Sequence, residues 1–368
     1  MNQTLGEAKV ESSSKDAGGH SPLETFILEE MEPRRGELNT FNDTKGHTKL
    51  LLDAARLRKL RAQKIGWTHI STFALYRSAT PIAGIYGNIT TLVSHQALRA
   101  TSSRELTRQC LVLSKIPQLP GKTLHVSQEK AAASFMERLD QPISIRPSAR
   151  AIRKGISAHL STGTDLARAW ERATSACAKL PVIKQQIDIE AFLPWIPLRV
   201  FVVGEHAVAA VARVPLYVVG DGSQTLSQLA VSELKRRNAP AFLETLKDVR
   251  AAGLLKAREL DPDMVLPTGR LQLLSYDHSG QQGQGWSIDI REQLSESLGE
   301  LAVNAMWAFP GLGATAVDIL TPSLSTSEGA VVSGVEPGAD LREFRFPAFG
   351  VSQFPNRAIL DRIAALAR

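Results

Sequence analysis

The chain has 368 residues, of which 43% are hydrophobic and 22% charged, so it is long enough for two or three packed subdomains. A formal charge of +6 suits an anionic ligand but does not specify one. No stretch approaches the roughly 20 continuous apolar residues of a membrane helix, and no basic start with an apolar run marks a signal peptide. Two cysteines, Cys110 and Cys177, cannot form a disulfide framework. We therefore expect a cytoplasmic protein without a membrane partner.

The first 40 residues are rich in Ser, Glu, Gly and Lys and lack apolar periodicity, which predicts a mobile leader. A short docked element is the alternative, and the residues that could form it are Leu23, Phe26, Ile27 and Leu28. Apolar residues at helical spacing then predict a helix over 48–63, and short strands are expected at 69–75 and 82–86. Residues 41–100 therefore form a small α/β unit.

Helices and strands of mixed order are expected over the rest of the chain. The predicted helices cover residues 102–115, 127–139, 164–178, 290–308 and 355–366, with two more between 226 and 255. The predicted strands cover residues 122–126, 142–146, 155–159, 187–192, 198–203, 206–213, 216–219, 271–275, 314–320 and 330–335. This order favours α+β subdomains over one doubly wound sheet. The glycine fingerprints of Rossmann and P-loop sites and the spacings of zinc sites do not occur in the sequence.

The longest basic stretch covers residues 56–61, Arg-Leu-Arg-Lys-Leu-Arg, at helical spacing among leucines. This pattern is typical of a solvated helix face. Nucleic-acid binding is the alternative, but no aromatic residues are interleaved with the basic ones and no known motif lies beside them. We expect no nucleic-acid partner.

The most specific passage spans residues 187–229. An apolar strand ends in Glu190, Leu-Arg-Val-Phe-Val-Val-Gly follows at 198–204, and Ala-Arg-Val-Pro at 212–215 precedes Val-Gly-Asp-Gly at 219–222. This passage resembles the core of ATP-grasp ligases of the cyanophycin synthetase and bifunctional glutamate–cysteine ligase/glutathione synthetase type. Weaker resemblance covers most of residues 47–368, through the segments 47–52, 103–111, 143–147, 316–320 and 335–338.

The resemblance implies an α+β ATP-grasp fold, in which two subdomains grip a nucleotide. The implied division is a preceding α/β unit at 41–100, a lid subdomain at 101–190 and a core subdomain with the metal strands at 191–368. It also implies ATP and Mg²⁺ as cofactors and amino acids or small peptides as substrates. The implied reaction is a carboxylate–amine ligation through an acylphosphate, and a homodimer is the implied assembly.

Phosphoryl transfer needs cations around the phosphates and carboxylates for magnesium, because negative charge moves during the reaction. The resemblance implies that Arg199 and Arg213 are catalytic. It implies nucleotide binding by Arg104, Arg146, Lys154 and Glu190, and metal binding by Asp318 and Glu336. Each has a structural alternative. The arginines could be solvated or pair with carboxylates, Glu190 could be a capping or cross-strand charge, and the two metal acids could be strand-end charges.

Several positions depart from the family pattern. The glycine-rich flap over the phosphates is replaced by residues 148–155, of which only Gly155 is a glycine, and the neighbouring basic residues could supply charge instead. Pro197 stands where the family has a ribose-binding Glu, Leu274 where it has a phosphate-side Arg, and Gly334 where it has a metal-binding Glu. These departures leave a second hypothesis open, a non-catalytic relative that binds a nucleotide or a partner.

Overall fold

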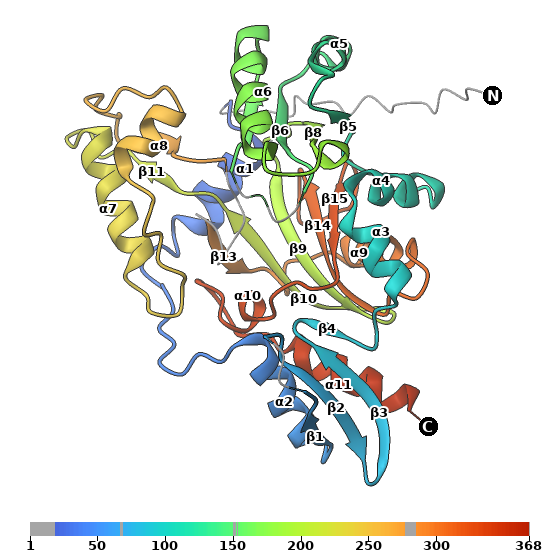
Figure 1. Cartoon of the computed structure of the whole chain (residues 1–368). Coiled ribbons are helices and arrows are strands. Elements are labelled where there is room, and N and C mark those ends of the chain that lie inside the picture. The colour runs from blue at the N-terminus through green and yellow to red at the C-terminus, as the bar shows by residue number, and fades with distance from the viewer. Residues whose placement is uncertain (1–18, 67–68, 150–151, 153, 277–284, 368) are drawn as a thin grey trace.

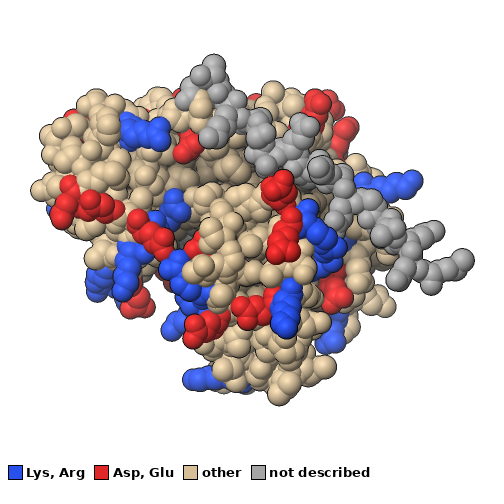
Figure 2. Space-filling view, turned by 90° about the horizontal axis from the view of Figure 1, so that it is seen from above, with Lys and Arg blue, Asp and Glu red and all other residues tan. Residues whose placement is uncertain are grey.

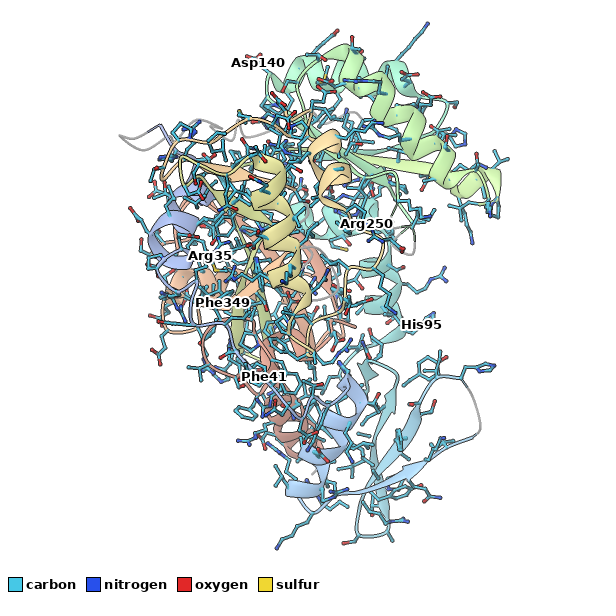
Figure 3. The ribbon with its side chains drawn as sticks, turned by 90° about the vertical axis from the view of Figure 1, so that its left-hand side faces the viewer. Arg35, Phe41, His95, Asp140, Arg250 and Phe349 are labelled. Atoms are coloured by element: carbon cyan, nitrogen blue, oxygen red, sulfur yellow. The ribbon has the colours of Figure 1, made fainter. Side chains whose placement is uncertain are left out.

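The computed structural model describes residues 19–66, 69–149, 152, 154–276 and 285–367. Three β-sheets of four or five strands organise the chain. From top to bottom in Figure 1 they form the lid, the core and the N-terminal unit, and Figure 3 shows the same order from the side, with Asp140 in the lid. No helix of the described residues is long and apolar enough to cross a membrane.

The N-terminal unit is an antiparallel sheet in the order β1-β2-β3-β4 beside one helix. Its elements are α2 (His47–Leu57), β1 (Arg61–Lys64), β2 (Thr72–Arg77), β3 (Thr80–Tyr86) and β4 (Ile89–Thr90). The helix predicted over 48–63 was too long. Lys59 has a left-handed backbone (φ 57°), which ends the helix, and the chain then turns into β1.

Aromatic packing and the last helix fasten this unit to the core. Phe41 makes edge contacts with Phe242 and Phe346, whose ring centroids lie 5.0 and 5.2 Å away, and Figure 3 shows it at the junction of the two parts. Helix α11 (Pro355–Leu366) packs against α2 and β3. Two short helices, α3 (His95–Ser102) and α4 (Arg104–Leu113), then lead towards the lid, and Ser94 and Ser103 cap them through their side chains.

The lid is an antiparallel sheet in the order β5-β8-β6-β7 with two helices on one face. Its elements are β5 (Gly121–His125), α5 (Glu129–Leu139), β6 (Ile143–Pro147), β7 (Ser157–Leu160), α6 (Gly163–Cys177), η2 (Val182–Lys184) and β8 (Gln186–Ala191). Ile143, Ile145, Ile187 and Ile189 pack with α5 and α6 in one apolar cluster. Because side chains alternate along a strand, the even-numbered residues of β6 and β8 point to the opposite face.

The core is a five-stranded antiparallel sheet in the order β13-β10-β9-β14-β15. Its strands are β9 (Ile196–Val203), β10 (His206–Val214), β13 (Trp286–Asp289), β14 (Ala314–Thr321) and β15 (Val331–Glu336). Helix α9 (Glu296–Trp307) covers the face that carries Leu198, Val200 and Val202. Around the sheet lie β11 (Tyr217–Val219), α7 (Leu226–Asn238), α8 (Ala251–Ala257), β12 (Leu271–Leu273) and α10 (Arg342–Arg345).

Within the described part of the segment before the N-terminal unit, residues 22–31 are part of the core and do not belong to a mobile leader. Helices α1 (Pro22–Phe26) and η1 (Ile27–Met31) bury Leu23, Phe26, Ile27 and Met31 in the main apolar cluster, as the alternative of a docked element required. Residues 1–18 of the expected leader lie outside the described part of the chain.

We expect Ile27→Ala to lower the free energy of unfolding by about 2–5 kcal/mol, because it empties a fully buried site in the core. Leu113→Ala is the control, since that side chain is 84% exposed, and its effect should stay within about 0.5 kcal/mol. Urea unfolding measures both. Equal effects would mean that the segment does not contribute to the core.

Candidate active site

Three charged side chains meet on the face of the core sheet opposite α9. Arg199 and Asp318 are register partners across β9 and β14, and Gly334 is the partner of Asp318 on β15. Glu336 lies two residues beyond Gly334 and therefore shares its face. Asp318 and Glu336 are therefore on the same face of the core sheet.

Arg199 holds this cluster together. Its Nε donates to Asp318 Oδ1 at 2.7 Å, and its Nη2 donates to Asp318 Oδ2 at 2.7 Å and to Glu336 Oε2 at 2.5 Å. Burial lowers the pKa of Arg199, but the carboxylates of Asp318 and Glu336 raise it well above its ordinary value. The guanidinium is therefore permanently charged and is 5% exposed.

Arg213 extends the cluster along β10. Its Nε and Nη2 donate to the carboxylate of Glu343 at 2.6 and 2.5 Å, and its Nη1 lies 3.5 Å from Asp318 Oδ1. Glu343 lies on α10, and this helix is fixed to the sheet because its neighbour Phe344 makes an edge contact with Phe201. Two predicted arginines and two predicted acids are thus brought together with a third acid.

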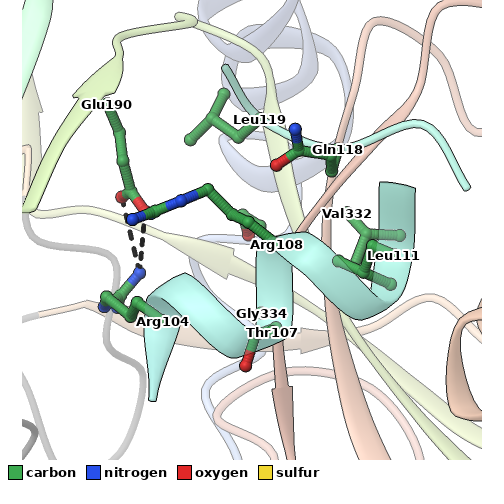
Figure 4. A pocket seen from close by; sticks show the side chains of 10 residues that line it. Arg104, Thr107, Arg108, Leu111, Gln118, Leu119, Glu190, Val332 and Gly334 are labelled. Carbon is green, nitrogen blue, oxygen red and sulfur yellow. Dashed lines mark hydrogen bonds and ion pairs between the residues drawn. The ribbon is translucent and has the colours of Figure 1, made fainter. Parts of the chain in front are cut away.

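A second cluster lies in the lid, around Glu190. Arg104 Nη1, Arg108 Nη1 and Arg146 Nη2 donate to this carboxylate at 3.0, 3.1 and 2.8 Å. Figure 4 shows Arg104 and Arg108 reaching Glu190 from helix α4. Arg104 on α4 is therefore paired and not solvated, and Glu190 also pairs with Arg146 on the neighbouring strand β6.

The titration of the lid cluster reflects crowding of positive charge. Burial raises the pKa of Glu190, but the charges of Arg104, Arg146 and Arg108 outweigh burial and lower it to about 2. The charge of Arg104, together with burial, lowers the pKa of Arg146. The three guanidinium groups thus have more positive charge than Glu190 alone neutralises.

Asp188 is the fifth member of the lid cluster. It is fully buried, lies opposite Arg146 in the sheet, and accepts a hydrogen bond from Arg108 Nη2 at 3.2 Å. Gly121 lies opposite Glu190, and a Cβ at this position would come within 2.8 Å of Glu190 Cγ. A glycine is therefore required here, since it makes room for the carboxylate.

The lid cluster lies close to strand β15 of the core sheet, which also carries Glu336. A cavity of about 10 Å³ lies between α4, β8 and β15, and its lining includes Arg104, Arg108, Glu190 and Gly334. The charge of Asp318 also acts on the pKa of Arg104. This volume holds about one water molecule, whereas small-molecule sites need about 300 Å³ or more, so a nucleotide requires these side chains or strands to separate.

The charges on the two sides are complementary to a magnesium nucleotide. Three arginines face two carboxylates in the lid, while in the core Arg199 and Arg213 face the three carboxylates of Asp318, Glu336 and Glu343. The lid surplus suits phosphate, and the acid surplus of the core suits a divalent cation by its chemistry. In this conformation, however, Arg199 occupies the oxygens that would bind the metal.

Lys154 is not brought into either cluster. It is exposed beside α6, in a shallow hollow of about 650 Å³ that Glu171 and Arg172 also line. Gly155 has φ 74°, and a Cβ there would meet Arg172 O at 2.9 Å. Packing against α6 therefore requires this glycine. Arg150 and Arg153 of the replaced flap lie outside the described residues.

The lid and core subdomains, facing each other across clusters of opposite charge, define an ATP-grasp fold. The crystal structure of a bifunctional glutathione synthetase from Pasteurella multocida is similar, with a TM-score of 0.57 and 21% sequence identity. The similarity covers 87% of this chain and 44% of that chain.

Sequence relatives agree with the fold. The chain is 26% identical to the glutathione biosynthesis bifunctional protein of Streptococcus thermophilus over 289 residues, which are 75% of this chain and 37% of that protein. It is 21% identical to the cyanophycin synthetase of Geminocystis herdmanii over 321 residues, 83% of this chain and 35% of that protein. The chain thus spans about a third of the length of these relatives. No family model matches it.

Sequence reasoning missed Asp188 and Glu343. The signal for Asp188 was its spacing of two residues from Glu190, which places both carboxylates on one face of a strand. Glu343 had no such signal, because α10 is a single turn whose position depends on tertiary packing.

Glu190→Gln should destabilise the protein by about 3–5 kcal/mol at neutral pH, because three partly buried arginines lose a shared, buried counter-ion. The lowered pKa of Glu190 means that its stabilisation is complete above its ordinary value of 4.5 and is lost as the pH falls towards about 2. The difference in unfolding free energy between wild type and variant should therefore shrink at acid pH. Urea unfolding between pH 7 and pH 3 measures this difference.

Glu205→Gln is the matched control, since Glu205 pairs with Arg362 on the surface and its side chain is 50% exposed. It should change stability little at any pH. A pH-independent difference for Glu190→Gln would show that its charge is not what stabilises the lid.

Proposed function

We propose that this chain is an ATP-dependent carboxylate–amine ligase that forms an amide or peptide bond on an amino acid or a small peptide through an acylphosphate. The observation that carries the proposal is the alignment of Arg213, Arg199, Asp318 and Glu336 on one sheet face. This face lies under the lid, where Arg146 and the two α4 arginines, Arg104 and Arg108, outnumber the acids Asp188 and Glu190. The relatives named above are synthetases or biosynthetic proteins, which supports a ligase.

The proposed roles follow from the charges. Arg104 and Arg146 bind nucleotide phosphates once Glu190 no longer neutralises them, and Arg199 and Arg213 stabilise the charge of the transferring phosphoryl group. Asp318 and Glu336 hold Mg²⁺, which would neutralise charge on the phosphates when bound. Lys154, on its exposed loop, reaches the nucleotide only if the loop moves.

The setting of the reaction is also a proposal. Both cysteines are free thiols in the structure, which is consistent with a reducing cytoplasm. A homodimer is proposed from resemblance alone. Nucleic acid is not proposed as a partner. On the face shown in Figure 2 basic and acidic side chains are interspersed, and within the basic stretch Arg58 pairs with Asp361 while Arg61 stacks on Tyr76.

A non-catalytic nucleotide-binding relative is the second candidate. Two observations favour it: Leu274, at the expected phosphate-side arginine, is fully buried in the apolar core, and Pro197 is buried within β9. Neither position can offer a polar group to a nucleotide. Gly334 likewise removes one metal-binding carboxylate.

Mg·ATP should raise the melting temperature of the protein, because a ligand that binds only the folded state stabilises it, by about 2.7 kcal/mol at a concentration of 100 Kd. Arg146→Ala should reduce this shift, since Arg146 lies on the inner face of the lid. Arg138→Ala is the control, because Arg138 is exposed on the outer helix α5. Thermal shift measurements at millimolar ATP test both. The absence of a shift in wild type would remove nucleotide binding and with it both candidate functions.

Release of ADP against a panel of amino acids and dipeptides decides between the two candidates. A ligase should release ADP only with its acceptor substrates, and Asp318→Asn should lower the rate by about 10²-fold or more, because charge on the phosphates is then left uncompensated. Asp361→Asn removes an equivalent arginine-paired carboxylate on the surface and should keep the wild-type rate. Nucleotide binding without turnover on any substrate would support the non-catalytic candidate.

A further inference from the structure

The guanidinium of Arg199 lies between the carboxylates of Asp318 and Glu336, the two proposed metal ligands. Its guanidinium makes a two-pronged contact with Asp318, at 2.7 Å on each oxygen, and one of the same nitrogens reaches Glu336 at 2.5 Å. The two carboxylates thus share a single nitrogen. A divalent cation bound by both acids would have to lie in the same place.

The strand position opposite Asp318 offers no further carboxylate, because it is Gly334. Gly334 faces Asp318, and a Cβ at this position would lie 3.4 Å from Asp318 Oδ2. Within the described ranges, no three His, Cys, Asp or Glu side chains are grouped so that they could hold a metal. Magnesium takes about six oxygen ligands, so two carboxylates already bonded to a guanidinium do not make a site.

We propose that Arg199 is the built-in counter-ion of Asp318 and Glu336, and that its ion pairs and a divalent cation at these acids exclude each other. The nucleotide-free chain then has no divalent-cation site here, and the metal arrives only with a phosphate group towards which Arg199 can turn. The inference rests on the proposed function only in treating Asp318 and Glu336 as the metal acids.

Arg199 has a third carboxylate nearby, besides those of Asp318 and Glu336. Its Nη1 lies 3.8 Å from Glu343 Oε2. Glu343 is itself hydrogen-bonded to Arg213. If Arg199 shifts away from Asp318, its guanidinium therefore still lies beside the carboxylate of Glu343. Loss of the Asp318 contact therefore need not leave a buried guanidinium without a counter-ion.

Calorimetric titration with Mn²⁺ alone, without nucleotide, tests the proposal. Wild type and Asp318→Asn should bind Mn²⁺ equally weakly, because Asp318 is not available in either. Arg199→Met removes the charge while keeping much of the side-chain length, and it should bind Mn²⁺ at least tenfold more tightly than wild type. The double variant Arg199→Met, Asp318→Asn should lose this gain.

Two controls distinguish a gain of Mn²⁺ binding from a general loss of structure in the variant. Arg58→Met also breaks a two-pronged arginine–aspartate pair, but it frees only the surface acid Asp361 and should gain no Mn²⁺ binding. If Arg199→Met is folded, Mn²⁺ should raise its melting temperature and leave that of wild type unchanged. If Arg199→Met does not fold, the difference in Mn²⁺ affinity between wild type and Asp318→Asn still tests the proposal.

Two results would overturn the inference: binding of Mn²⁺ to nucleotide-free wild type that Asp318→Asn weakens tenfold or more, or a folded Arg199→Met variant without any gain. Neither result bears on whether Mg·ATP binds or ADP is released. Conversely, a chain that fails to bind ATP could still show the gain of Mn²⁺ binding in Arg199→Met.

Discussion

The pairing of Arg199 with Asp318 is the interaction on which the active face of this protein depends. The two residues are register partners in adjacent antiparallel strands, and both side chains lie on the side opposite α9. A buried guanidinium is tolerated only with a counter-ion, and removal of one partner of such a pair typically costs about 3–5 kcal/mol. The register of β9 and β14 is therefore fixed both by this pair and by the apolar residues that alternate with it.

The same alternation orders everything around the pair. On β9, β10 and β14 the side chains of Phe201, Val211 and Ala316 share the face of Arg199 and pack towards α11 and the N-terminal unit. One sheet face is thus apolar at one end and charged at the other. The N-terminal unit covers the apolar end, and the charged end faces the lid (Figure 1). Because its two ends differ in polarity, this single sheet face contributes both to the apolar core and to the candidate site.

The lid sheet also has one apolar and one charged face, but the charge around its charged face is net positive. Its isoleucines face α5 and α6, while Arg146, Asp188 and Glu190 face the core. The surplus of positive charge around Glu190 and of negative charge around Arg199 attract each other, since the charge of Asp318 raises the pKa of Arg104. Opposite surpluses are what a magnesium nucleotide would need, but here they also neutralise one another. A ligand must therefore replace internal ion pairs, and its binding energy is reduced accordingly.

The sequence by itself determined the mixed order of strands and helices and the resemblance that indicates the ATP-grasp fold, because these depend on local periodicity and on residues close together along the chain. The end of the helix expected over 48–63 was an exception, since β1 begins at Arg61. Asp318 and Glu336 lie on different strands, so the register of β14 and β15 was needed to place them on one face. Only the tertiary structure decided which charges neutralise which. The pairing of Arg104 with Glu190, the placing of Glu343 beside Arg213, the exposure of Lys154 and the docking of Ile27 all join residues far apart in sequence. Such contacts arise from packing of separate elements, and no local pattern specifies them.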